Sequence, residues 1–136
     1  MILLMDCPYC ASPTKVTNSR QRARGSQVWR RRVCTKCGCI WTTHESVDMS
    51  KSHRVLTRQN SVQPFSRDVL FISIKDSLHH RKTALEDATY LTDTILTRIL
   101  ALKTPQITTA AITTLTTPVL KNFDPLAAKL YNAMHA

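Results

Sequence analysis

The sequence has little glycine, few acidic residues and no long apolar run. Its 136 residues include only two glycines, Gly25 and Gly38. The threonine-rich stretch 108–117 therefore cannot be a phosphate-binding loop, because such loops depend on glycine. The apolar start, residues 1–5, is far too short for a signal peptide or a membrane span, so we expect no membrane partner. Nine acidic residues stand against 19 lysines and arginines, and the net charge of +10 favours a polyanionic partner.

Cysteine is also scarce, and its pattern does not suit disulfides. The chain has five cysteines, an odd number, and four of them form two Cys-x-x-Cys pairs. This arrangement indicates a reducing compartment, and we expect a cytoplasmic protein. The fifth, Cys39, is expected to be a partly buried side chain beside the second pair. The alternative is a redox or replacement-ligand role.

The two pairs, Cys7 with Cys10 and Cys34 with Cys37, are separated by 23 residues. Two such pairs at this distance predict one structural zinc ion with four thiolate ligands, although a rubredoxin-type iron centre uses the same ligands. A site closed by four thiolates has no open position for catalysis. No histidine or acid is placed as a base for these thiols, so we expect no catalytic residue and no enzyme.

The segment between the pairs has the length of a β-hairpin, which predicts a zinc ribbon over residues 6–46. The expected strands are residues 14–20, 28–34 and 40–43, with a turn at Gly25 and Ser26. A domain of about 40 residues buries too little apolar surface to fold alone, so the metal must supply the difference. Trp29 and Trp41 are expected to pack across this small sheet, the alternative being stacking on bases.

The ribbon contains six arginines that we interpret as a nucleic-acid surface. They are Arg20, Arg22, Arg24, Arg30, Arg31 and Arg32. Side chains alternate along a strand, so Arg30 and Arg32 should share one face and Arg31 should take the other. Arginine suits phosphates and guanine edges alike, so the partner is DNA or RNA. The plain alternative is a solvated charged face.

After a polar linker, residues 47–53, a second domain is expected over residues 54–136. A short hairpin with its turn at Asn60 should come first, followed by about four helices. The fold class is therefore α+β, a β ribbon followed by a small, mostly helical domain. The predicted helix caps are Ser66, Thr83 in a capping box with Glu86, Thr109, and Asp124 followed by Pro125. Pro118 should kink or stop the third helix.

Apolar stripes predict which side of each helix is buried. The stripes are Val69, Leu70, Ile74 and Leu78; Leu85, Ala88, Leu91, Ile95 and Ile99; Ile112 and Leu115; and Leu126, Leu130 and Met134. Each is most simply a core face.

The order of motifs resembles the NrdR family, bacterial transcriptional repressors of ribonucleotide reductase genes. The matching stretches are Cys7-Pro-Tyr-Cys10, Asn18-Ser19-Arg20, Arg30-Arg31-Arg32-Val33-Cys34, Cys37-Gly38, Trp41-Thr42-Thr43-His44-Glu45 and Pro64-Phe65-Ser66-Arg67. The resemblance implies a zinc ribbon joined to an ATP-cone domain. It further implies ATP or dATP as effector, with Val55, Arg58 and Phe65 at the nucleotide site. The chain departs from the family at Thr57 and Val69, where lysines are usual, and at Asn60, where glycine is usual.

Two functions follow as hypotheses. In the first, the protein is a zinc-dependent repressor that binds promoter DNA as a dimer, tetramer or larger homo-oligomer, with assembly controlled by ATP or dATP. In the second, it is an accessory module that binds RNA or a protein partner, and its degenerate cone serves only oligomerisation. The replacements at Thr57 and Val69 favour the second interpretation of the cone.

Overall fold

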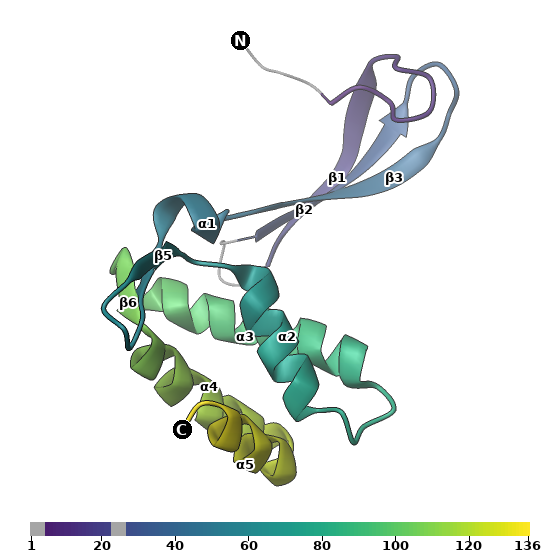
Figure 1. Cartoon of the computed structure of the whole chain (residues 1–136). Coiled ribbons are helices and arrows are strands. Elements are labelled where there is room, and N and C mark those ends of the chain that lie inside the picture. Colours follow the sequence, from purple (N-terminus) through teal and green to yellow (C-terminus); the bar gives the residue numbers. More distant parts are fainter. Residues whose placement is uncertain (1–4, 23–26) are drawn as a thin grey trace. The chain divides into compact units, whose positions relative to one another are not determined.

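The structure is a computed structural model that describes residues 5–22 and 27–136. The chain divides into two compact units, one ending at Val47 and the other covering Asp48–Ala136. We call them the ribbon unit and the helical unit. Strands dominate the first and helices the second (Figure 1), so the α+β prediction is confirmed. None of the helices that the structure describes has the length and apolar character needed to cross a membrane.

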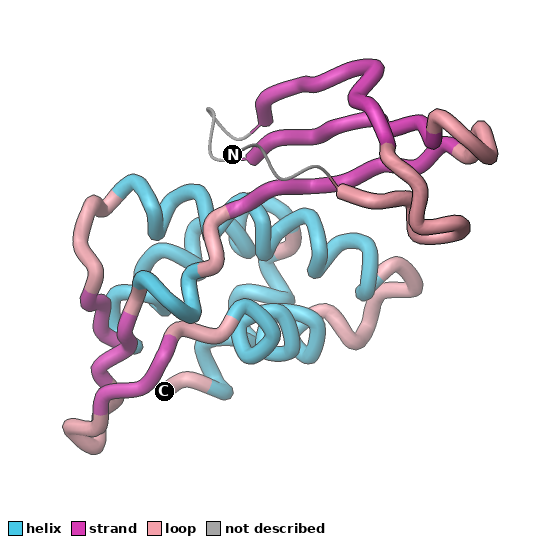
Figure 2. The backbone as a smooth tube through the Cα atoms, turned by 90° about the horizontal axis from the view of Figure 1, so that it is seen from above, coloured by secondary structure: helices cyan, strands magenta, loops and turns pink. Residues whose placement is uncertain are grey.

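The ribbon unit is an antiparallel sheet of three strands in the order β1-β2-β3. The strands are β1 Thr14–Arg22, β2 Gln27–Cys34 and β3 Ile40–Ser46, and they run side by side in Figure 2. All three expected strands are present, and each extends beyond its predicted range. The turn expected at Gly25 and Ser26 lies outside the described residues.

A β-bulge in β1 sets which side chains share a face. Val16 pairs with Arg32, but Asn18 pairs with Arg31, so Thr17 is the extra residue. Its hydroxyl donates to the Arg31 carbonyl at 3.3 Å. One extra residue reverses the faces for the rest of a strand. Beyond the bulge, β1 therefore presents its even-numbered residues on the face of Arg31.

The helical unit begins with a short helix where the sequence predicts only linker. This helix, α1 Met49–Ser52, is capped by Asp48, whose carboxylate accepts from the Ser50 amide. Met49 belongs to the apolar core. Residues 47–53 therefore differ from the polar linker that the sequence predicts. Met49 is the one buried side chain of α1, and a single apolar residue forms no periodic pattern that would predict a helix.

A second small sheet follows, in the order β5-β4-β6. Its strands are β4 Arg54–Leu56, β5 Val62–Pro64 and β6 Gln106–Thr108. The hairpin of β4 and β5 turns at Asn60, whose φ of 59° agrees with the predicted turn. β6 pairs in parallel with β4 and was not predicted.

Four longer helices complete the unit: α2 Arg67–Ser77, α3 Ala84–Ala101, α4 Thr109–Phe123 and α5 Pro125–Met134. Ser66 and Asp124 cap α2 and α5 as predicted. Two other caps differ, because Thr108 rather than Thr109 caps α4 and the Thr83 side chain makes no cap bond. The Thr83 hydroxyl donates to Asp87 instead. Pro118 does not stop α4, which continues to Phe123.

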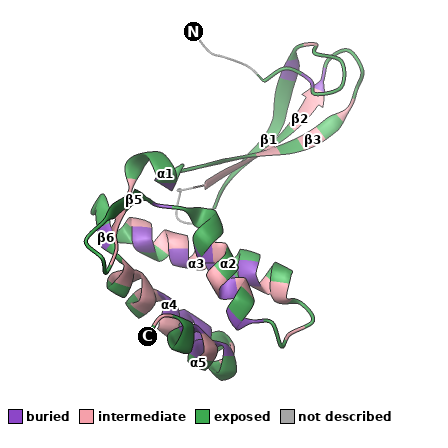
Figure 3. Ribbon diagram, viewed as in Figure 1, coloured by how far each residue is buried: buried purple, intermediate pink, exposed green. Residues whose placement is uncertain are grey.

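The buried residues gather on α2 to α5, as Figure 3 shows. Most predicted stripes enter this core, but Val69 and Leu85 are 65% and 58% exposed. In α5 the prediction is wrong: the buried residues are Ala127, Ala128 and Tyr131, while Leu126 and Met134 are about half exposed. The small alanines allow close helix packing, and the large tyrosine fills the core beside them.

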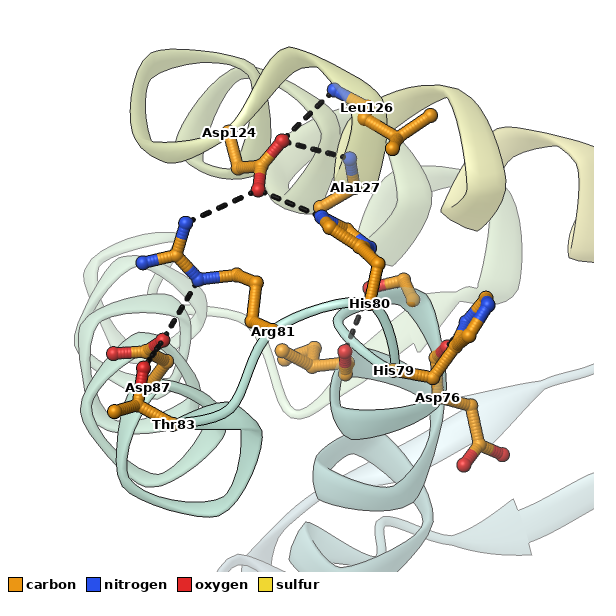
Figure 4. Close-up of polar contacts among 11 residues, drawn as sticks. Asp76, His79, His80, Arg81, Thr83, Asp87, Asp124, Leu126 and Ala127 are labelled. Atoms are coloured by element: carbon orange, nitrogen blue, oxygen red, sulfur yellow. Dashed lines mark hydrogen bonds and ion pairs between the residues drawn. The ribbon is translucent and has the colours of Figure 1, made fainter.

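Asp124 joins the start of α5 to the loop between α2 and α3 (Figure 4). Its Oδ1 accepts from the amides of Leu126 and Ala127 at 3.0 and 3.3 Å. Its Oδ2 contacts His80 Nε2 at 2.8 Å and Arg81 Nη1 at 3.2 Å. The hydrogen bond to His80, followed by those from the Ala127 amide and Arg81, lowers the pKa of Asp124 to about 2. The carboxylate therefore stabilises the folded unit.

We predict that Asp124→Ala destabilises the helical unit by roughly 1–2 kcal/mol at pH 7 through loss of the cap. Asp124→Asn keeps a capping side chain and removes only the charge. Because folding lowers the pKa of Asp124 to about 2, its charge contributes above the unfolded pKa of about 4, and this contribution is lost as the pH falls towards 2. Urea unfolding followed by helical circular dichroism measures the free energy of unfolding. The wild type should exceed Asp124→Asn in this free energy at neutral pH, and the difference should disappear as the pH falls through that range. Parallel pH curves would contradict the assignment.

Candidate metal centre and nucleic-acid interface

Two turns bring the four paired cysteines together at one end of the ribbon sheet. The sulfurs of Cys7, Cys10, Cys34 and Cys37 lie within 4.8 Å of one another. The Cys7–Cys37 and Cys10–Cys34 sulfur distances are 3.6 and 3.5 Å. A tetrahedral zinc ion with bonds of about 2.3 Å places its sulfurs about 3.8 Å apart. The four side chains are thus positioned to bind one metal ion, consistent with structural zinc.

The two turns have the same backbone geometry. The Ala11 amide donates to the Cys7 carbonyl at 2.8 Å, and the Gly38 amide donates to the Cys34 carbonyl at 3.2 Å. Ala11 and Gly38 both have left-handed backbones, with φ of 58° and 73°. Each residue directly follows the second cysteine of its pair. The left-handed step turns the chain away so that both sulfurs of a pair point to one place.

Backbone amides also prepare the thiols for a cation. The amides of Cys37 and Lys36 both donate to Cys34 Sγ at 3.3 Å and lower the pKa of Cys34 to about 6. The pKa of Cys37 is raised: the Cys39 amide opposes this, but burial and the nearby thiols outweigh it. Several thiolates cannot coexist here without a positive charge. Metal uptake should therefore release protons and weaken as the pH falls.

Ala11 and Gly38 form a matched test of this turn geometry. Gly38→Ala should weaken the zinc-loaded ribbon by about 1 kcal/mol, because a side chain opposes a left-handed backbone. The added Cβ itself meets nothing within 4 Å. Ala11→Gly should stabilise the zinc-loaded ribbon, but by less than Gly38→Ala destabilises it, since glycine also adds entropy to the unfolded chain. Competition for zinc with a chromophoric chelator measures the zinc affinity of both variants. Equal changes of the same sign in the two affinities would contradict the shared turn geometry.

The arginines divide between the two faces of the sheet. Register places Arg20 opposite Trp29 and Trp29 opposite His44, while Arg31 lies opposite Asn18 and Thr42. We define the basic face as the one that carries Lys15, Arg20, Arg22, Trp29, Arg31 and His44. Arg30 and Arg32 lie on the opposite face with Trp41. The tryptophans are therefore on different faces and do not pack together as expected. Arg24 lies outside the described residues.

The two faces also differ in how their arginines are bonded, and among the described residues of these faces only Arg30 has its charge neutralised by an ion pair. On the opposite face, Arg30 Nη1 contacts Glu45 Oε2 at 2.8 Å, and Arg32 Nε donates to Thr43 Oγ1 at 3.3 Å. In the described part of the chain, Arg20, Arg22 and Arg31 make no ion pair, and all three are exposed. The basic face therefore holds uncompensated guanidinium groups around a half-buried tryptophan. This arrangement suits phosphates together with a stacked base.

The helical unit contains a cavity of about 190 Å³ at the position of the expected nucleotide site. Val55 and Phe65 line it, as do Thr57 and Val69, the two positions where lysine is usual in the family. Arg58 is not among its lining residues and donates instead to the His135 carbonyl at 2.6 Å. Within residues 27–136, no lysine, arginine or acidic side chain lines the cavity. A triphosphate does not fit this composition.

Comparison with known proteins supports a single family. Residues 5–45 match the family model described as "Transcriptional repressor NrdR-like, N-terminal domain". Over 124 residues, 90% of this chain, the sequence is 33% identical to the transcriptional repressor NrdR of Aromatoleum aromaticum, covering 72% of that protein. It is 32% identical to the Bartonella henselae protein of the same name, covering 77% of it. It is 36% identical to the Methylobacterium radiotolerans protein of the same name, covering 70% of it. These relatives are named for a non-enzymatic role.

Proposed function

Because this chain belongs to the NrdR family of transcriptional repressors, we propose that it represses transcription by binding promoter DNA through the basic face of its ribbon unit. The observation that carries this proposal is the set of exposed arginines on that face, Arg20, Arg22 and Arg31, which form no ion pair with any residue that the structure describes. The family resemblance adds the target, the genes of ribonucleotide reductase. Such a repressor acts in the cytoplasm.

Zinc has a structural part in this proposal. Cys7, Cys10, Cys34 and Cys37 would hold one ion, and the ion would fix the two turns from which the three strands emerge. The register of these strands then decides which arginines face the duplex. The metal thus supports DNA binding without touching DNA.

A single ribbon unit is too small to bind one DNA site tightly, so the protein has to assemble. One ribbon offers a small contact, and specific binding by a single module of this size is weak. We propose that the helical units form a homo-oligomer, a dimer or larger, which places ribbons on paired half-sites. In the version that the family resemblance implies, ATP or dATP controls this assembly by binding one state better than another. The uncharged cavity favours the other version, in which the helical unit assembles without triphosphate control.

Fluorescence anisotropy with the zinc-loaded full chain tests the function. The probes are a duplex from a ribonucleotide reductase promoter of the source genome, an unrelated duplex of equal length, and an RNA of equal length, all at the same salt concentration. The promoter duplex should bind at least tenfold more tightly than both others. Equal binding of the two duplexes, or tighter binding of RNA, would contradict the repressor and favour an accessory RNA-binding module.

A further inference from the structure

The cavity in the helical unit has an interior that is unusual for a phosphate site. It lies between the small sheet and helices α2, α4 and α5, and its walls include Val55, Phe65, Leu70 and Ile112. Its polar lining consists mainly of hydroxyl groups, several of them already bonded. Thr57 Oγ1 contacts Ser61 Oγ at 2.6 Å, for example, and the Thr113 hydroxyl donates to the Thr109 carbonyl. The surroundings favour an apolar ligand.

The helix ends at the cavity offer little to an anion. Ser66 Oγ accepts from the Val69 amide at 3.3 Å, and Thr108 Oγ1 accepts from the Ala111 amide at 3.1 Å. These bonds use amides that a phosphate would otherwise contact. The nearby arginines are also engaged, since Arg67 pairs with Asp93 at 2.8 Å and Arg58 is held by the His135 carbonyl.

One polar atom at the cavity has no partner. The His135 ring lies against the Tyr131 ring, with centroids 4.3 Å apart, and both residues line the cavity. His135 Nε2 is buried and, among the residues that the structure describes, has no hydrogen-bond partner. A buried ring nitrogen without a partner is unfavourable unless something hydrogen-bonds to it. This nitrogen is closed off from the cavity, so a polar group of a ligand would gain no hydrogen bond from it there.

The two ionisable side chains at the cavity are both neutral near pH 7. Burial lowers the pKa of His135, and the neighbouring Arg58 adds to this effect. Burial raises the pKa of Tyr131. The lining residues themselves therefore offer a charged ligand no opposite charge in return for the water that it loses.

We propose that this cavity binds an uncharged, mainly apolar small molecule, and that it does not bind a nucleoside triphosphate. The ligand class follows from the apolar walls and the uncharged lining. Thr57 and Val69 are the specificity-determining positions, because lysines there would supply the missing positive charge. The proposal concerns only the helical unit and is independent of DNA binding.

The test uses N-phenyl-1-naphthylamine, an uncharged apolar dye whose emission rises in an apolar site, with the zinc-loaded full chain and no DNA. The dye should bind the wild type, and millimolar magnesium-ATP should not displace it. Ser73→Phe, which adds a ring to the cavity wall, should weaken dye binding at least tenfold. Arg98→Ala, a change elsewhere on the helical unit, is the matched control and should leave dye binding unchanged. Helical circular dichroism reports whether each variant is folded.

A gain of function completes the test. Val69 is 65% exposed, so a lysine there can reach water in the free protein. The double variant Thr57→Lys with Val69→Lys should bind magnesium-ATP at least tenfold more tightly than the wild type, as measured by calorimetry. Binding of ATP to the wild type as tight as to the lysine variant would overturn the proposal. So would dye binding that is absent from the wild type or unchanged by Ser73→Phe in a folded variant.

Discussion

Removing zinc from the full chain should unfold the ribbon unit and leave the helical unit folded. Of the described residues of the ribbon unit, only Cys7, Thr14 and Cys34 are buried, so this unit has almost no apolar core. The helical unit has a continuous core that extends from Met49 to Tyr131. Structural zinc contributes on the order of 10–16 kcal/mol in small finger peptides, more than a ribbon of this size gains by burial. The two units should therefore respond differently to a chelator.

The chain provides a separate signal for each unit. Both tryptophans, Trp29 and Trp41, lie in the ribbon unit, while all the longer helices lie in the helical unit. Chelation should shift tryptophan emission to longer wavelength and leave most of the helical circular dichroism. Cys34→Ser should produce the same shift without a chelator. Cys39→Ser is the matched control and should retain zinc. Unchanged tryptophan emission after complete chelation would show that the ribbon folds without metal.

Arg31→Ala should weaken DNA binding about tenfold or more, whereas Arg30→Ala should have little effect. The two residues are neighbours on β2, so the two variants have the same net charge but change opposite faces of the sheet. Arg31 is exposed on the basic face, and Arg30 already contacts Glu45 at 2.8 Å. A charge-assisted contact to phosphate is worth roughly 1.5–3 kcal/mol, enough for this difference.

The dependence of affinity on salt separates a direct phosphate contact from a general charge effect. Loss of one phosphate contact should reduce the slope of log K against log salt by about 0.9. We expect this reduction for Arg31→Ala and expect nearly three times as much for the combined Arg20, Arg22 and Arg31 alanine variant. Equal slopes for Arg30→Ala and Arg31→Ala would show that the DNA-binding face is not the one assigned here.

Features with a local chemical signal were predictable from the sequence. The spacing of the cysteines predicted the ribbon because two short turns must deliver four sulfurs to one ion. Asn60 marked the hairpin turn because it tolerates a positive φ, and Ser66 and Asp124 marked helix starts because their side chains accept from free amides. In each case a few adjacent residues determine the structure.

Features that depend on which of several possible contacts forms were not predictable. The bulge at Thr17 has no glycine or proline to announce it, yet it decides which arginines lie beside Arg31. The Thr83 hydroxyl, free to cap α3 by its position, donates to Asp87 instead. In α5 the larger residues Leu126 and Met134 suggested the buried face, but close packing selected the alanines and Tyr131. In all three cases the local sequence pattern does not show which contact forms.

The central claim is that one metal ion shapes the DNA-binding surface. Its most direct test is the affinity of the full chain for the promoter duplex, measured with zinc bound, after chelation, and after one equivalent of zinc is returned. Tight binding should be lost with the metal and recovered on its return, with helical circular dichroism nearly constant throughout. A metal-free chain that binds the same duplex as tightly at the same salt concentration would contradict the account.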